Sequence, residues 1–261
     1  MFEDAGLLRD YYRTRQGRHV AMRLRRAVTE FWSRAPNACN AVVGYAPPVL
    51  RSDDESRTLA LMPRRLGPVR WPKKGQGRAA LVDSRALPVQ NVQLDRLLLI
   101  HALEFDPNPS RFLDECWRVL DGSGRLMVMA PNRNGLWARA EKTPFGHGRP
   151  YSRGQLRQLL QEHGFTPVEA RTILFTPPAA PGLFLRIGPQ IERLGRNWSP
   201  AVGGVLVIEA EKNLYAPAGQ TSRQRQTTAR GARKLAPRPT GAIREGANDR
   251  VRLRESAGGT S

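Results

Sequence analysis

Residues 79–132 read AALVDSRALPVQNVQLDRLLLIHALEFDPNPSRFLDECWRVLDGSGRLMVMAPN, and this stretch decides the fold class. Two apolar runs of strand length, at 96–102 and 125–130, flank a segment whose apolar residues recur every three to four positions. A shorter apolar run at 79–82 precedes them. Apolar strands without polar alternation are typical of parallel strands buried on both faces. The strand–helix–strand order therefore predicts a doubly wound α/β protein, and any member of that class fits the pattern.

The helix between these strands has clear start and stop signals. Asn108 can cap its N-terminus, and Pro109 suits the first helical position, where a missing N–H costs nothing. One buried face is expected from Phe112, Leu113, Cys116, Trp117 and Leu120. Gly122 and Gly124 are expected to adopt left-handed conformations that end the helix and lead into the next strand.

The same stretch carries a family resemblance. LPVQNVQLDRLLLIHALEF, followed by a helix ending in WRVL and by DGSGRLMVMAPN, resembles the second half of class I S-adenosylmethionine-dependent methyltransferases of the type 11 kind. In that family "LP…FD" leads into the fourth strand, "RvLkpGG" closes the next helix and the fifth strand ends in "PN". The resemblance covers roughly residues 41–215. It implies a Rossmann-like α/β fold, with a seven-stranded, mostly parallel sheet and helices on both faces.

Three parts of the chain are expected. Residues 1–36 form an N-terminal helical extension in which Gly17 is the expected break, and 37–215 form the methyltransferase-like α/β domain. Residues 216–261 are rich in Gly, Pro, Ser, Thr and Arg, with too few apolar residues to offset the entropy of ordering, so a disordered basic tail is expected. A short helix is expected near 183–194.

Composition favours a soluble, cytoplasmic protein with no membrane partner. Cys39 and Cys116 are too few for a disulfide framework, which favours a reducing compartment. No apolar run is long enough to cross a bilayer, and the N-terminus lacks the apolar centre of a signal peptide. The sequence also has no metal-ligand cluster, Walker loop, G-x-S-x-G elbow or paired-cysteine site.

The formal net charge of +19 allows two interpretations. Arginine accounts for 37 of the 42 basic residues, a skew that either nucleic-acid binding or the codon usage of a GC-rich genome can produce. The arginines are scattered along the whole chain, which favours the incidental origin. A basic loop at 64–78 contains Trp71, which can stack on a base or can anchor the loop to the core.

The first strand, expected at 40–45 (NAVVGY), carries the weakest part of the resemblance. The family usually has an acid and then two or three alternate glycines, which let the backbone pass close to the cofactor. This first motif is degenerate here, because only Gly44 remains and Asn40 stands at the position of the acid. The second strand ends in Met62, where the family has an acid that binds the ribose hydroxyls. The resemblance still implies S-adenosylmethionine as cofactor, with Gly44, Tyr45 and Met62 among its binding residues.

Asp83 ends the third strand, expected at 79–83. Open α/β sheets bind ligands at the carboxyl edge of their strands. The resemblance implies that the Asp83 carboxylate accepts a hydrogen bond from the adenine amino group, with Ser84 beside it in the cofactor site. Alternatively, Asp83 caps the turn that follows the strand, and the two roles are compatible.

His101 and His147 are the candidate catalytic residues. His101 and Glu104 follow the fourth strand, near the place where the resemblance implies that methyl donor and acceptor meet, so His101 also belongs to the expected cofactor-binding set. His147 lies with Phe145 in the Gly-rich loop 135–150, and in this fold such a loop typically covers the acceptor pocket. Either histidine can act as a base or can make only a structural hydrogen bond.

The leading functional hypothesis is S-adenosylmethionine-dependent methyl transfer to a small-molecule acceptor. One alternative is a degenerate methyltransferase fold that has lost catalysis and serves as a binding or regulatory protein. A second alternative is an RNA-directed methyltransferase that holds RNA through the basic loop and the tail. Against this second alternative, the end of the fourth strand reads HALEF and lacks the N-P-P-Y tetrad of amino-group methylation.

Overall fold

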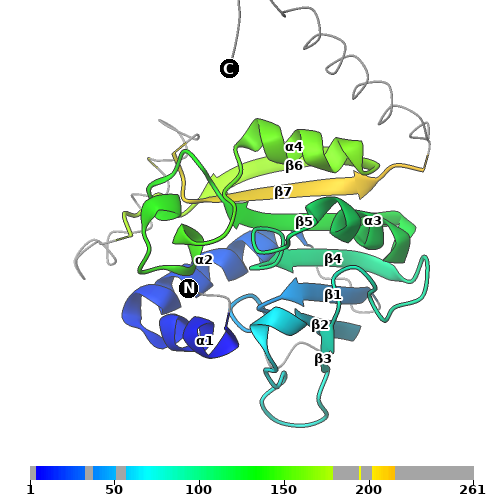
Figure 1. Ribbon diagram of the computed structural model, residues 1–261, viewed down its shortest axis with the longest axis horizontal. Helices are drawn as coiled ribbons and strands as arrows, with labels where there is room; N and C mark the ends of the chain where they lie inside the picture. The colour runs from blue at the N-terminus through cyan, green and yellow to red at the C-terminus, as the bar shows by residue number, and fades with distance from the viewer. Residues whose placement is uncertain (1–3, 33–37, 51–56, 179–193, 195–201, 215–261) are drawn as a thin grey trace, which may run out of the picture. The chain divides into compact units, whose positions relative to one another are not determined.

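The described part of the protein consists of residues 4–32, 38–50, 57–178, 194 and 202–214 of a computed structural model (Figure 1). The predicted tail at 216–261 lies outside the described residues, as does nearly all of the predicted helix at 183–194. The expectations for these two segments therefore remain predictions.

Seven strands of the described part form one sheet in the order β3-β2-β1-β4-β5-β7-β6 (Figure 1). Their bounds are β1 Cys39–Gly44, β2 Arg57–Pro63, β3 Ala79–Val82, β4 Leu94–Ile100, β5 Leu120–Pro131, β6 Phe165–Ile173 and β7 Val205–Lys212. Neighbouring strands within the set β1 to β5 run parallel to each other, whereas β7 is antiparallel to both β5 and β6. The predicted seven-stranded, mostly parallel sheet is confirmed.

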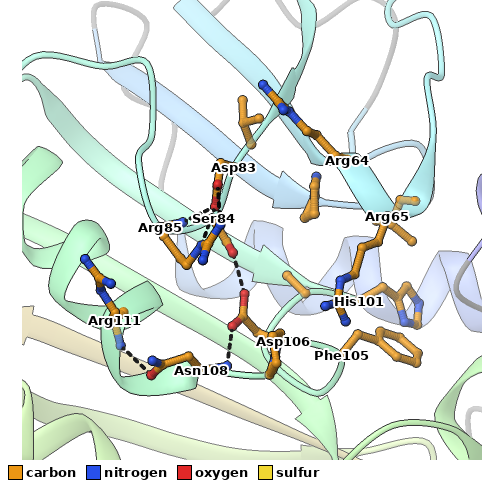
Figure 2. Close-up of a pocket in the computed structure, with 15 residues that line it drawn as sticks. Arg64, Arg65, Asp83, Ser84, Arg85, His101, Phe105, Asp106, Asn108 and Arg111 are labelled. Carbon is orange, nitrogen blue, oxygen red and sulfur yellow. Dashed lines mark hydrogen bonds and ion pairs between the residues drawn. The ribbon is translucent and has the colours of Figure 1, made fainter.

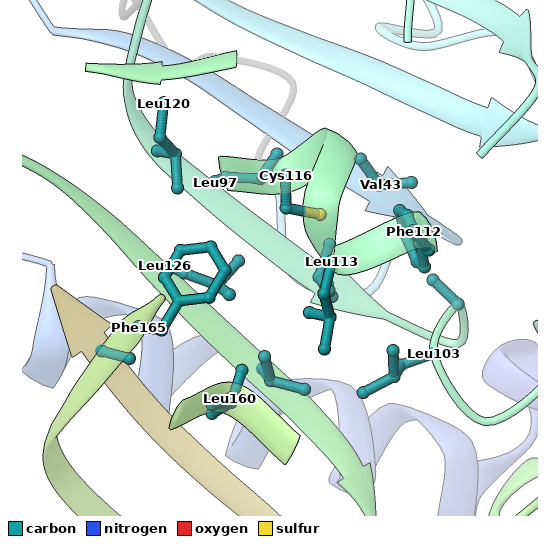
Figure 3. Packing of buried hydrophobic residues seen from close by; sticks show 14 of the residues in the cluster. Val43, Leu97, Leu103, Phe112, Leu113, Cys116, Leu120, Leu126, Leu160 and Phe165 are labelled. Carbon is teal, nitrogen blue, oxygen red and sulfur yellow. The ribbon is translucent and has the colours of Figure 1, made fainter. Parts of the chain in front are cut away.

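Helices cover both faces of this sheet. The described helices and short turns are α1 Ala5–Arg13, α2 Arg15–Phe31, α3 Pro109–Val119, α4 Arg153–Glu162, η1 Arg64–Leu66, η2 Leu136–Arg139 and η3 Pro144–Gly146. Val43 of β1 belongs to an apolar cluster with Leu113 of α3 and Leu160 of α4 (Figure 3). Its neighbour Val42 faces the other side and clusters with Leu24 of α2. In the described part of the chain, no helix has the length and apolar character that crossing a membrane requires.

Helix α3 begins as the sequence predicts and ends differently. The Asn108 side chain accepts a hydrogen bond from the backbone N–H of Arg111 at 3.2 Å, which confirms the cap. The prediction that Gly122 and Gly124 adopt left-handed conformations is wrong. The reason is that β5 begins at Leu120, where it already pairs with β4, so the chain passes from helix to strand without a glycine turn.

The break between the two N-terminal helices also differs from its predicted position. It falls at Thr14, because the Thr14 hydroxyl donates to the Tyr11 carbonyl at 2.7 Å and accepts the N–H of Gly17 at 2.9 Å, which caps α2. Gly17 lies inside α2 and serves a different purpose. A Cβ at Gly17 would lie only 2.0 Å from the carbonyl oxygen of Tyr11, so glycine permits the close approach of α1.

The basic loop after β2 is anchored by its tryptophan. Trp71 is 4% exposed and packs in the same apolar cluster as α2, which confirms the anchoring interpretation for this residue. In this conformation the indole is closed off from solvent and presents no face for base stacking.

Candidate functional site

A cavity of about 390 Å³ lies at the carboxyl edge of the sheet, between the ends of β2, β3 and β4 and the start of α3 (Figure 2). Ser84 and His101 line it, and its charged lining comprises Arg64, Arg65, Asp83, Arg85, Asp106 and Arg111. Four guanidinium groups therefore surround two carboxylates. No group of three or more metal-ligating side chains occurs among the described residues.

Asp83 is tied to the turn that follows β3. Its carboxylate accepts hydrogen bonds from the Arg85 side chain at 3.1 and 2.9 Å and from the Arg85 backbone N–H at 2.9 Å. These hydrogen bonds lower the pKa of Asp83 to about 2, with the Arg85 side chain the largest cause. The turn-capping role is confirmed, and the carboxylate, 37% exposed, also lines the cavity and stays ionised at neutral pH.

Asp106 links the end of β3 to the start of α3. One carboxylate oxygen accepts a hydrogen bond from the Ser84 hydroxyl at 2.5 Å. The other accepts a hydrogen bond from the backbone N–H of Asn108 at 2.8 Å. Since Asn108 caps α3, this chain of contacts holds the cavity wall in place (Figure 2). Both oxygens of Asp106 are engaged, so the carboxylate is oriented before any ligand arrives.

Three of the four cavity arginines have uncommitted guanidinium groups. Within the described segments, the side chains of Arg64, Arg65 and Arg111 make no hydrogen bond or ion pair. Arg64 and Arg65 follow directly on β2, and the Arg65 side chain extends into the cavity (Figure 2). The cavity therefore carries an excess of positive charge that a carboxylate or phosphate group can neutralise.

His101 is the buried end of the cavity. It follows β4 directly and has a φ of 50°, a left-handed conformation that is uncommon and strained for a residue with a bulky side chain. Its Nε2 lies 2.7 Å from the hydroxyl of Tyr12, and its Nδ1 lies 3.3 Å from a carboxylate oxygen of Glu104. The other Glu104 oxygen accepts the N–H of Ala102 at 3.1 Å. Tyr12, His101 and Glu104 therefore form a line of polar groups in which the imidazole is hydrogen-bonded at Nε2, while Nδ1 lies near Glu104 without a hydrogen bond.

Aromatic rings enclose this line of polar groups. The Tyr12 ring stacks on Tyr45 with centroids 5.8 Å apart and 14° between the planes, and the Phe145 ring lies 5.0 Å from His101. Burial, followed by the charges of Tyr11, Glu104 and Tyr45, raises the pKa of Tyr12 well above its ordinary value. The Tyr12 hydroxyl therefore keeps its proton and is available to donate it to Nε2.

The three predicted cofactor residues near β1 and β2 lie outside the cavity lining. Met62 is 1% exposed in the core, and Tyr45 is 2% exposed under Tyr12. Gly44 has a φ of 112°, and a Cβ there would lie 1.8 Å from the carbonyl oxygen of Ile100. Glycine is thus required at this position for packing against β4. The structure brings together Asp83, Ser84 and His101 of the predicted set, and the cofactor roles of Gly44, Tyr45 and Met62 remain predictions.

The second candidate base lies in a surface loop. A ring nitrogen of His147 is 2.6 Å from the carbonyl oxygen of Glu141. The aromatic residue that this loop brings to His101 is Phe145 of η3. Sequence reasoning missed Tyr12, Arg65 and Asp106. Asp106 has a local signal, since a carboxylate just before a capping Asn108 can bind the free N–H groups of the helix start, whereas Tyr12 reads only as one of several apolar residues on a helix face.

Curated proteins similar to this chain include two from Mycobacterium tuberculosis, strains CDC 1551 and H37Rv. Each is named a probable S-adenosylmethionine-dependent methyltransferase, and each is 33% identical over 124 residues, which is 47% of this chain and 43% of the relative. The chain thus matches less than half the length of these relatives. No protein-family model matches the sequence.

Solved structures with a similar fold include S-adenosylmethionine-dependent methyltransferases from Thermotoga maritima and Archaeoglobus fulgidus. The first has a TM-score of 0.56 and 18% identity, covering 78% of this chain and 94% of its own. The second has a TM-score of 0.55 and 18% identity, covering 79% of this chain and 99% of its own. Together with the strand order, these likenesses show that the chain has the class I methyltransferase fold.

Proposed function

Since the chain has the class I methyltransferase fold, we propose that it transfers a methyl group from S-adenosylmethionine to a small-molecule acceptor. Two kinds of observation support the proposal. The curated relatives carry the name of this activity, and a cavity with an ionised carboxylate lies at the edge of the sheet where open α/β folds bind their ligands.

The residues that line the cavity fit such a cofactor. Its volume of about 390 Å³ falls in the range of about 300–1,000 Å³ that is usual for small-ligand sites. Asp83 and Asp106 present oxygen atoms that accept hydrogen bonds from amino and hydroxyl groups. Arg64 and Arg65 present guanidinium groups that match the carboxylate of the amino-acid end. Acceptors and donors for both ends of the cofactor are therefore present in one cavity.

When bound, S-adenosylmethionine supplies a methyl group that is already activated by its sulfonium sulfur. The remaining tasks of the protein are to orient the ligands, to exclude water and to receive a proton. Arg85 fixes the Asp83 carboxylate and keeps it ionised, so this carboxylate can orient a bound ligand without rearranging. His101, with its ring between Tyr12 and Glu104, holds or receives a proton at Nε2, and α1 covers this side of the site.

The single observation that carries the proposal is the ionised Asp83 in the cavity at the sheet edge. Calorimetric titration with S-adenosylhomocysteine should show binding in the micromolar range. Asp83→Asn should weaken this binding about tenfold, because one charged hydrogen-bond acceptor is lost. Asp121→Asn, at the second residue of β5, serves as the control and should leave binding unchanged.

A non-catalytic module is the alternative, and one feature favours it. Gly44 packs on the Ile100 carbonyl, and Asn40 of β1 and Met62 of β2 stand where the family resemblance leads one to expect carboxylates. An absence of heat at high ligand concentration would select this alternative. RNA-directed transfer has less support, because the tryptophan of the basic loop is buried in the core.

A further inference from the structure

The Tyr12 hydroxyl lies against a ring nitrogen of His101. A methyl acceptor that gives its proton to this histidine would need the same position. Tyr12 belongs to α1, and its hydroxyl is 2.7 Å from Nε2 of His101 although the residues are 89 positions apart in sequence. Its ring lies flat on Tyr45 at a centroid distance of 5.8 Å. Phe145 lies against the His101 ring at 5.0 Å. The chain itself therefore shows that a phenol ring fits this place with its oxygen on the imidazole.

His101 is arranged to receive a proton from that oxygen. When the hydroxyl donates to Nε2, the ring proton lies on Nδ1, which faces Glu104 at 3.3 Å. The side chains of His101 and Glu104 are 0% and 1% exposed, so this pair of polar groups is shielded from water. The left-handed backbone at His101 is strained, and such strain is concentrated at functional residues.

Tyr12 can leave this place only if α1 moves. Part of α1 packs in a small apolar cluster with Tyr45 and Leu66, whereas its Tyr11 belongs to the larger apolar cluster that includes α2. A helix of nine residues is marginal by itself. Opening of α1 would remove the Tyr12 ring from Tyr45 and free Nε2.

We propose that the subsite bounded by His101, Tyr45 and Phe145 binds the hydroxyl-bearing aromatic ring of the methyl acceptor, and that Tyr12 fills this subsite in the closed protein. The inference rests on the proposed methyltransferase function and adds the class of substrate, a phenol. Tyr12 is then an internal stand-in for the acceptor.

The transfer balances with the groups present. The phenolic oxygen gives its proton to Nε2 of His101 and forms the new bond to the methyl carbon. The bond between that carbon and sulfur breaks, and its electron pair remains on sulfur, which becomes a neutral thioether. The imidazolium returns its proton to solvent when the methyl ether leaves. Burial raises the pKa of the Tyr12 hydroxyl at this position, so a phenol here needs a base within hydrogen-bond distance.

The test replaces the Tyr12 ring by free ligands. Tyr12→Ala removes a phenol and leaves a cavity against His101, and thermal unfolding is then followed with added phenol or benzene. Phenol should raise the melting temperature of this variant more than benzene does. A purely apolar cavity would show the reverse order, since benzene gains more from leaving water. The matched control is Tyr11→Ala, the neighbouring tyrosine on the same helix, which is 6% exposed and should show no preference for phenol.

Equal stabilisation by benzene and phenol, or the same preference for phenol in Tyr11→Ala, would overturn the proposal. If Tyr12→Ala loses α1, Tyr12→Phe keeps the ring and removes only the hydroxyl. The ¹⁵N signal of His101 Nε2 should then shift relative to the unmodified protein, and an unchanged signal would contradict the contact.

Failure of the substrate class is distinguishable from failure of the proposed function. Calorimetry of the unmodified protein with S-adenosylhomocysteine tests the function alone, whereas the phenol titration needs no cofactor. With S-adenosylmethionine and phenol together, Tyr12→Ala should form methoxybenzene, detected by mass spectrometry. If both ligands bind and no methoxybenzene forms, a phenol is not the acceptor, while the cofactor site still stands.

Discussion

The two sides of His101 differ in nearly every physical property. On the open side, Asp83 is 37% exposed and pairs with Arg85 in a cavity lined by further arginines. On the closed side, Tyr12 and Glu104 flank the imidazole, and the Glu104 side chain is 1% exposed. Exposed ion pairs are screened and contribute about 0–1 kcal/mol, whereas a buried polar group that loses its hydrogen-bond partner costs about 1–3 kcal/mol. The open side should therefore control ligand binding, and the closed side should control stability and proton movement.

The largest expected effect is at the glycine beside the closed side. Gly44→Ala should lower the free energy of unfolding by several kcal/mol, because the new Cβ would lie 1.8 Å from the Ile100 carbonyl oxygen. Gly75→Ala is the control, since Gly75 also has a positive φ of 82° but has no atom within 4 Å of the new Cβ. This control should cost only about 1–2 kcal/mol. Similar losses for both variants, measured by urea unfolding, would mean that glycine is needed at position 44 only for its positive φ and not for the close approach of Ile100.

The second prediction compares one substitution on each side of His101. Glu104→Gln should lower the free energy of unfolding by about 1–2 kcal/mol, because it weakens the buried hydrogen bond that the Glu104 side chain accepts from the N–H of Ala102. Asp83→Asn should leave the free energy of unfolding nearly unchanged and should instead weaken binding of S-adenosylhomocysteine. The comparison fails if the two substitutions destabilise the protein equally in urea, or if Glu104→Gln is silent.

Much of the fold could be predicted from sequence because its signals are local. The apolar runs around β4 and β5, the Asn108 cap and the helix periodicity of α3 all lie within one short stretch. Asp83 was predictable for the same reason, since it ends a strand at the edge where ligands bind. The exceptions have tertiary causes. Leu120 and Arg125 both pair with β4, so Gly122 and Gly124 lie in an irregular part of β5 between them, although by themselves they read as helix-ending residues.

The closed side of the site could not be predicted in the same way. The contact between Tyr12 and His101 spans 89 positions, and the Tyr12 sequence context indicates only a helix face. The position of Gly44 could be predicted, but its role in packing against Ile100 depends on the register of β1 against β4. Sequence patterns report periodicity and caps, whereas the partners of a buried polar group are set by the assembled sheet.

Two buried tyrosines, Tyr45 under Tyr12 and Tyr151 in the core, also lead us to expect a dependence on alkaline pH. Burial raises the pKa of Tyr45 and of Tyr151 to about 12, from an ordinary value of 10.0. The folded state then holds protons that the unfolded state loses above pH 10, so stability is fully present below pH 10 and falls as the pH rises toward 12. Each tyrosine should account for a loss on the order of 2 kcal/mol over this window. Urea unfolding at pH 8 and pH 11 checks this loss, and Tyr45→Phe should show a smaller difference than the unmodified protein. An unchanged difference would contradict the assignment to Tyr45.

The smallest expected effect belongs to the uncommitted arginines of the open side. Replacement of both Arg64 and Arg65 by alanine should weaken binding of S-adenosylhomocysteine by about fivefold or less, because exposed charge pairs contribute about 0–1 kcal/mol each. The loss should shrink as salt is added, since exposed charges are screened within about 10 Å at 0.1 M. Arg57→Ala is the matched control, because Arg57 starts the same strand β2 at the opposite edge of the sheet. Tighter binding in the double variant would show that the arginines repel the ligand, and a loss that persists at high salt would show that they pack against it instead of neutralising its carboxylate.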